Sequence, residues 1–168
     1  INNKLSIALN SVLYESSRTP LFYIINTYIP FDYDIESLRL FWFIFSLTLP
    51  ILFYHTLRLT ISERLNRIHI ALFALILFIS PYFRTNAYWP SSENLQIFFV
   101  ILSLFFYSLL FNKNKKFLLY SFSSLSIFFA YCAFYTDQKA FFLVALIYFD
   151  LIRRNNLFFF IVFSFINL

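Results

Sequence analysis

The sequence contains no glycine, no methionine and a single cysteine, and each shortage excludes a class of site. Without glycine, the phosphate-binding loops and nucleophile elbows that require this residue cannot form. Cys132 has no second cysteine for an internal disulfide, and the chain does not supply a cysteine- and histidine-rich zinc site. Helix contacts of the Gly-x-x-x-Gly type are also excluded, so close packing must rely on alanine and on serines such as Ser121, Ser123, Ser124 and Ser126.

Charge is scarce as well. Charged residues make up 12% of the 168 residues, and hydrophobic residues make up 61%. A soluble domain has about 25% charged and about 45–50% apolar residues. The chain therefore has too little polar surface to cover a water-soluble globule, and much of its exterior must face lipid. The composition predicts a membrane protein.

The apolar runs predict an all-α fold, a polytopic bundle of transmembrane helices with an amphipathic juxtamembrane helix at its N-terminal end. Residues 1–37 form the predicted juxtamembrane segment on the outer face, and residues 38–168 form a truncated transmembrane domain of about five or six spans. The predicted spans are residues 40–57, 68–83, 95–111, 117–135, 140–152 and 157–168.

The links between the spans alternate in charge. Links 58–67, 112–116 and 153–156 are basic, whereas links 84–93 and 136–139 are neutral overall. Cytoplasmic loops carry an excess of Lys and Arg. We therefore expect an integral multi-pass protein of a bacterial inner membrane or an endoplasmic reticulum-like membrane, with the basic links in the cytoplasm. The net charge of +5 then reflects topology, and no binding to nucleic acid is expected.

The link over residues 81–93 holds the groups best suited to chemistry. Glu93 is the candidate catalytic residue, since an acid at the membrane edge can act as a general base or hold a divalent metal. Arg84 suits bidentate binding of phosphate, and Tyr88 and Trp89 are further candidates for substrate contact. The alternative is a solvated loop with an Arg84–Glu93 pair and an aromatic anchor at the interface.

Further candidates for substrate binding lie on the same predicted face. They are Arg18 and the turn formed by Asp137, Gln138 and Lys139. The turn can contact a ligand head group or serve simply to join two helices. Acids at Asp32, Asp34 and Glu36 can hold a cation through carboxylate oxygens, although acids before a helix start also offset its dipole. Near the basic end, Asp150 is expected to pair with Arg153 or Arg154.

Four short stretches carry a resemblance to a known enzyme class. They are Ser17-Arg-Thr-Pro-Leu-Phe-Tyr23, Leu38-Arg-Leu40, Ser80-Pro81 and Ser92-Glu93. Their order resembles that of the GT-C class of polytopic glycosyltransferases, which use polyprenyl- or dolichyl-phosphate-linked sugars. The stretches match a Pro-Pro-Leu-Tyr-like juxtamembrane segment, a Leu-Arg-Leu opening of the next span, and the two ends of the second outer loop.

The resemblance implies transfer of a sugar from a lipid-phosphate donor to an acceptor at the outer face. Glu93 would assist catalysis or hold a metal, and Arg84 and Lys139 would neutralise the leaving phosphate. In this class a catalytic acid lies in the first outer loop, upstream of the juxtamembrane helices. We therefore expect the chain to be an internal fragment, with membrane lipid and the lipid-linked donor as its partners.

Two other functions compete with this prediction. A non-catalytic subunit of an organelle-encoded membrane complex would suit the phenylalanine-rich spans and the low-GC bias of the composition. A transporter or flippase module would place ionisable residues at mid-span, where this chain has almost none.

Overall fold

The computed structural model describes residues 21–28, 35–61, 64–89, 91–110 and 116–154. The elements are α2 (Leu21–Tyr28), α3 (Ile35–Ile61), α4 (Arg67–Ile79), α5 (Pro81–Tyr88), α6 (Ser92–Leu110), α7 (Lys116–Phe134), the 3-10 turn η1 (Gln138–Ala140) and α8 (Phe141–Arg154). These described residues form helices and no strand, which confirms the all-α prediction. The predicted N-terminal amphipathic helix, Arg18 and the predicted sixth span lie outside them.

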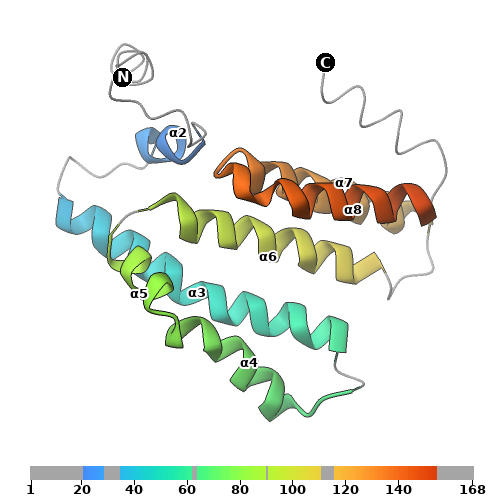
Figure 1. Ribbon diagram of the computed structural model, residues 1–168, viewed down its shortest axis with the longest axis horizontal. Coiled ribbons are helices and arrows are strands. Elements are labelled where there is room, and N and C mark those ends of the chain that lie inside the picture. Colours follow the sequence, from blue (N-terminus) through green and yellow to red (C-terminus); the bar gives the residue numbers. More distant parts are fainter. Residues whose placement is uncertain (1–20, 29–34, 62–63, 90, 111–115, 155–168) are drawn as a thin grey trace.

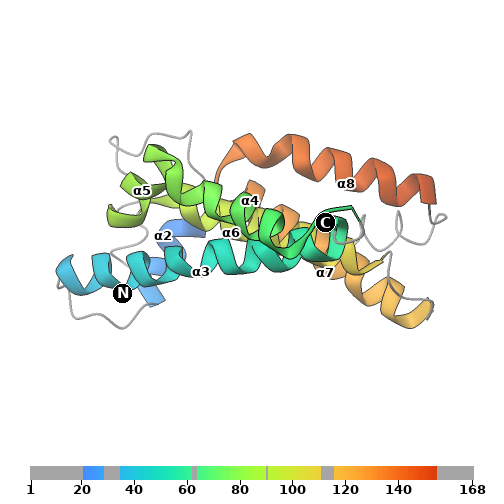
Figure 2. The same ribbon diagram turned by 90° about the horizontal axis from the view of Figure 1, so that it is seen from below.

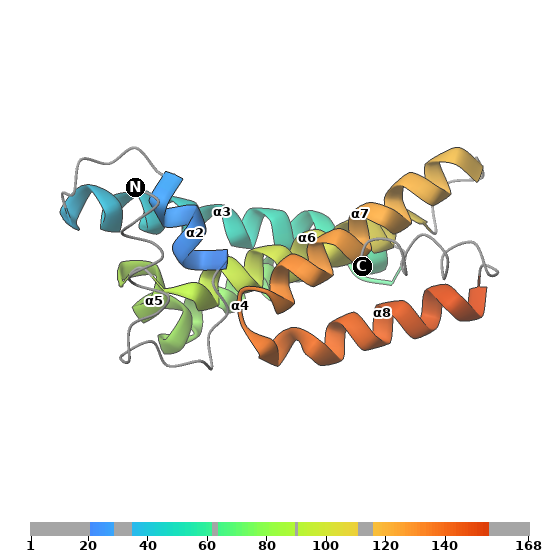
Figure 3. The same cartoon turned by 90° about the horizontal axis from the view of Figure 1, so that it is seen from above.

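The helices run roughly side by side; α3 is antiparallel to α4, and α6 is antiparallel to α7, whereas α3 and α6 start at the same end and run parallel (Figure 1). Figure 1 shows α4, α3, α6 and α7 in sequence across the molecule. In the views from below and above, α5 and α8 lie on the same side of the layer formed by α3, α6 and α7 (Figures 2 and 3). The resulting bundle has two ends.

Two helices, α3 and α6, are long and apolar enough to cross a membrane. The pair α4 and α5 makes a third candidate if it counts as one broken span. The apolar stretch Tyr120–Phe134 within α7 is shorter than α3 and α6, and α8 has 14 residues. A span needs about 20 residues. The described residues therefore support membrane association through two or three candidate spans, fewer than the five or six predicted.

The predicted second span is interrupted at Ser80, and α4 and α5 meet there at an angle of 64°. Pro81 lacks the N–H that would continue the helix, and it pushes the preceding residue out of the helical region. Ser80 accordingly has an extended backbone, and its side chain accepts a hydrogen bond from the Phe83 N–H. Residues 81–88, predicted as part of a polar link, thus begin a new helix with a proline in its first turn.

Serine provides the close contact between α6 and α7, as the lack of glycine predicted. The Ser103 hydroxyl donates to the Ser126 carbonyl at 2.8 Å, and the Ser126 hydroxyl donates back to the Ser103 carbonyl at 3.0 Å. Both residues are fully buried, as is Ser123 on α7. Small side chains allow two helix backbones to approach closely in a membrane. These reciprocal bonds also satisfy polar atoms that an apolar interior would otherwise leave unpaired.

The short helix α2 packs against one end of the bundle. Its Phe22 lies in a buried cluster with Trp42 of α3 and Leu95 of α6. The Trp42 indole N–H donates to the side-chain oxygen of Asn26 at 2.9 Å, so the ring has both an apolar contact and a polar partner. The cluster ties a segment outside the candidate spans to the starts of two of them.

The serine pair gives a direct test of this packing. We expect Ser126→Ala to lower the free energy of unfolding by about 0.5–1.5 kcal/mol, because its hydroxyl bonds across the interface. Ser124→Ala is the matched control, since Ser124 is exposed on the same helix. Unfolding in mixed micelles would measure both. Equal losses for the two variants would contradict a specific role for the pair.

Candidate functional site

The predicted site residues come from three elements. Arg84, Tyr88 and Trp89 lie on or directly after α5, Glu93 lies in the first turn of α6, and Asp137, Gln138 and Lys139 form the turn around η1. Figure 1 shows these elements at the same end of the bundle as the start of α3, which we call the polar end. The side-chain amide of Gln96 on α6 donates to the Asp137 carbonyl at 3.0 Å and joins two of the elements.

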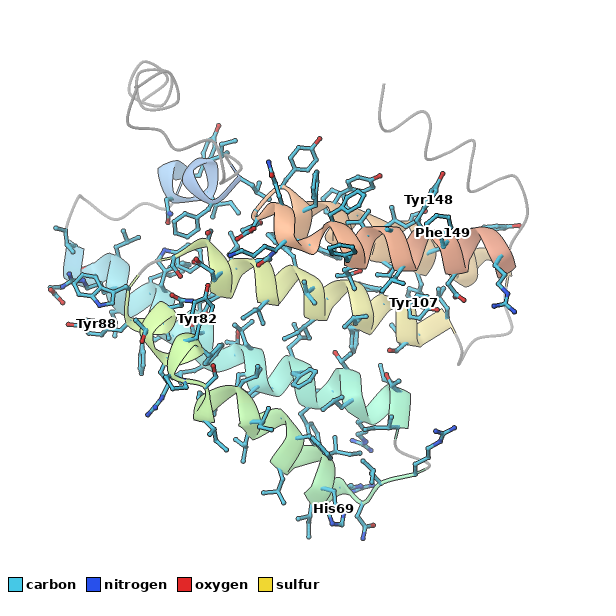
Figure 4. The ribbon with its side chains drawn as sticks, viewed as in Figure 1. His69, Tyr82, Tyr88, Tyr107, Tyr148 and Phe149 are labelled. Carbon is cyan, nitrogen blue, oxygen red and sulfur yellow. The ribbon has the colours of Figure 1, made fainter. Side chains whose placement is uncertain are left out.

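A surface pocket of about 350 Å³ lies on the outer side of α5. It is lined by Pro81, Arg84, Thr85, Tyr88 and Trp89, all of which are exposed. These residues share one side of the helix, whereas Phe83 and Ala87 on the other side are buried. Figure 4 shows Tyr82 and Tyr88 at this end, with His69 at the opposite end of α4. The pocket therefore combines one guanidinium with two aromatic rings.

Arg39 on α3 contacts the same aromatic pair and was not among the predicted site residues. Its guanidinium carbon lies 4.3 Å from the centre of the Trp89 ring and 5.5 Å from that of Tyr88. Its Nη1 also pairs with the Glu36 carboxylate at 2.6 Å. Such cation–π contacts hold the end of α5 against the start of α3. Glu36, a predicted candidate for cation binding, instead holds this arginine.

Glu93 is buried, with 8% of its surface exposed. The Ser92 hydroxyl lies 3.5 Å from one of its carboxylate oxygens, and the start of α6 favours a negative charge. Arg84 is exposed on α5. The alternative of a solvated loop is therefore wrong for Glu93, because its side chain is enclosed by the surrounding helices.

Asn94 is the most enclosed polar residue of the site and was also missed from the sequence. It is 1% exposed, and its Nδ2 donates to the Ser46 hydroxyl at 2.8 Å and to the Phe83 carbonyl at 3.4 Å. The amide thus links α6 to α3 and α5. The residue directly follows the predicted catalytic acid, but only the packing reveals its role.

The η1 turn is held by Asp137. Its carboxylate accepts a hydrogen bond from the Lys139 N–H at 3.0 Å and pairs with the Lys139 ammonium at 3.3 Å. The hydrogen bond to Asp137, and then its charge, raise the pKa of Lys139, with smaller electrostatic contributions from Tyr82 and Glu93. Gln138, in the same turn, is exposed.

No group of three or more His, Cys, Asp or Glu side chains arranged to hold a metal ion occurs among the described residues. Asp32 and Asp34, two of the predicted cation ligands, lie outside that part of the chain. A divalent metal stays a prediction from the resemblance.

Away from the polar end, Asp150 on α8 accepts a hydrogen bond from the Tyr107 hydroxyl of α6. Figure 4 shows Tyr107 and Tyr148 along neighbouring helices in this region. The predicted pairing of Asp150 with Arg153 or Arg154 stays a prediction, and helical spacing alone gave no indication of a tyrosine 43 residues away. Arg58, Arg64, Arg67 and Arg153 are exposed toward this end.

The Asp137 carboxylate should contribute measurably to stability. We expect Asp137→Ala to lower the free energy of unfolding by about 1–2 kcal/mol, because the carboxylate caps the turn and is itself buried. Asp137→Asn, which keeps an acceptor, should cost less, and Lys139→Ala should cost little because its side chain is exposed.

The pH dependence of the same pair has a definite sign. Because the pKa of Lys139 is raised above its ordinary value of 10.5, the pair stabilises the fold fully below that value. The contribution is lost as the pH rises through the higher pKa of the folded state. Unfolding at neutral and strongly alkaline pH would measure it, and an Asp137→Ala effect that grows with pH would contradict it.

Comparisons with protein-family models, with curated proteins and with solved structures find no match to this chain. The resemblance to glycosyltransferases therefore stays a prediction from short motifs, and the geometry of the polar end is what supports a functional proposal.

Proposed function

We propose that this chain is part of an integral-membrane glycosyltransferase that transfers a sugar from a lipid-phosphate donor to an acceptor at the periplasmic or lumenal face. The observation that carries the proposal is the position of the Arg84 pocket, which lies where an exposed apolar helix face meets the polar end. A ligand that fits this position has a hydrocarbon tail and an anionic head group.

The apolar face belongs to α4. Its exposed residues Ile68, Leu72, Ile76 and Ile79 are spaced so that they share one side of the helix. The pocket begins at Pro81, two residues after the last of them. A long hydrocarbon chain can lie along α4 within the lipid, and its phosphate then reaches α5. There Arg84 offers the planar, fixed charge that pairs well with phosphate oxygens.

The chemistry of the transfer assigns a role to each charged group. The acceptor oxygen attacks the anomeric carbon, the bond from that carbon to the phosphate oxygen breaks, and the lipid phosphate leaves with the bonding electrons. The acceptor proton passes to a carboxylate. Glu93 suits this step, whereas Asp137 already caps η1 and pairs with Lys139. Arg84 and Lys139 balance the charge that gathers on the leaving phosphate.

The first test concerns donor binding. We expect the protein in neutral-lipid vesicles to bind a polyprenyl monophosphate, and Arg84→Ala to weaken this binding by about tenfold to a hundredfold, because a charge-assisted hydrogen bond is lost. The fluorescence of Trp89 can report binding, since the other tryptophan, Trp42, is buried. Arg64→Ala is the matched control, an exposed arginine at the opposite end. Equal weakening by both variants would show non-specific attraction and refute the site.

The second test concerns catalysis. We expect Glu93→Gln to lower the rate of sugar transfer from a polyprenyl-phosphate sugar by about 10²–10⁴-fold while donor binding is retained, because the proton acceptor is lost and the shape is kept. Asp150→Asn is the control, a carboxylate on α8 away from the polar end; the variant keeps an acceptor for the Tyr107 hydroxyl and should leave the rate unchanged. Transfer of labelled sugar by membranes that contain the protein is the measurement. Donor binding without any transfer by the wild type would favour a non-catalytic role.

A further inference from the structure

The end of the bundle opposite the polar end carries four exposed arginines, and we call it the basic end. They are Arg58 in the last turn of α3, Arg64 in the link to α4, Arg67 in the first turn of α4, and Arg153 near the end of α8. Figure 1 shows these segments at the same end of the molecule. None of the four pairs with a carboxylate among the residues that the structure describes.

Three of these arginines lie in one short helical hairpin. The Arg64 N–H donates to the Ile61 carbonyl at 3.0 Å, so the chain turns directly after α3. Arg58 precedes this turn by three residues, and α4 begins at Arg67. The stretch is basic in the sequence, since its one acid is Glu63. Like charges this near repel one another, and a cation in the first turn of a helix is unfavourable. An anionic partner would offset both effects.

The exposed apolar side chains of α8 lead to the fourth arginine. Phe142, Leu146 and Phe149 are 76%, 68% and 70% exposed. Their spacing of four and three residues places them on one side of the helix, and Arg153 continues the series four residues further on. Figure 4 shows Phe149 on the part of α8 that leads to the basic end. One side of this helix is therefore an apolar stripe that ends in a positive charge.

The same arrangement occurs on α4. Ile68, Leu72 and Ile76 are exposed on one side of this helix, and the stripe starts directly after Arg67. Figure 4 shows His69 at this start of α4. An arginine can keep its hydrocarbon stem along an apolar surface while its guanidinium reaches the polar layer. Two separate helices thus place an apolar stripe and an unpaired guanidinium next to each other at the basic end.

A phospholipid has the chemistry that matches this arrangement. Its acyl chains fit the apolar stripes, and its phosphate fits the guanidinium groups. A zwitterionic head group would bring a further cation among arginines that have no carboxylate partner in the described residues. A head group with a net negative charge brings none, and each Lys or Arg near an anionic membrane surface adds to the attraction.

We propose that the basic end is a docking surface for anionic phospholipids, with acyl chains along the stripes of α4 and α8 and head groups at the arginines. The proposal is independent of the proposed glycosyl transfer. Trp89 lies at the polar end, where it contacts Arg39, so its fluorescence reports donor binding there and not lipid at the basic end.

The test compares two lipids with identical acyl chains, phosphatidylglycerol and phosphatidylcholine, in equal amounts in micelles of a neutral detergent. Native mass spectrometry of the full chain measures the ratio of the two lipids that stay bound. We expect the wild type to retain phosphatidylglycerol preferentially. The double variant Arg67→Gln/Arg153→Gln should lower this preference by about fivefold for each arginine replaced. Its melting temperature in the neutral detergent should be unchanged, because both side chains are exposed.

Two further variants serve as controls. Arg67→Lys/Arg153→Lys keeps the charge and should keep most of the preference. Asn66→Ala changes an exposed, uncharged side chain of the same hairpin, one that makes no capping bond, and should leave the preference unchanged. Equal retention of both lipids by the wild type would overturn the proposal and leave the arginines to an acidic protein partner or to topology alone. An undiminished preference in the glutamine variant would place the lipid elsewhere and would also overturn it, as would equal losses in the glutamine and lysine variants.

Discussion

The arrangement of the polar end depends on the amide of Asn94. Its nitrogen bonds to Ser46 in the middle of α3 and to the Phe83 carbonyl at the start of α5, so one side chain of α6 fixes three helices. Because the residue is buried, loss of this amide would leave its partners without water to replace it. The same contact holds the first turn of α5 against the first turn of α6, where Glu93 lies.

The second constraint is the break between α4 and α5. Pro81 ends one helix and starts another, and Ser80 caps the new one, so α5 leaves the direction of α4. One face of α5 then turns outward with Arg84, and the other turns toward α3 and α6. Arg39 stacks on Trp89 and holds the far end of the helix.

Hydroxyl groups within the apolar helices also find hydrogen-bond partners. Within the apolar helices, hydroxyl groups bond to a neighbouring helix or to their own backbone, as Thr60 does with Ser108 and Thr56 does with the Leu52 carbonyl. Ionisable groups gather at the two ends. The described residues of the polar end include both carboxylates and cations, whereas the opposite end exposes arginines. This separation is what a chain in contact with lipid requires.

Composition and periodicity were enough to predict an all-α membrane protein, the helices near residues 40–57 and 95–111, and the use of serine in place of glycine. These features depend on local hydrophobicity and on side-chain size, which the sequence states directly. The bend at Ser80, the burial of Glu93 and the roles of Arg39 and Asn94 were decided by tertiary structure. Arg39 and Trp89 are 50 positions apart, and Asn94 and Ser46 are 48 positions apart, so these pairs meet only when the helices pack. Such contacts carry no periodic signal, because they depend on the relative placement of helices that sequence spacing does not encode.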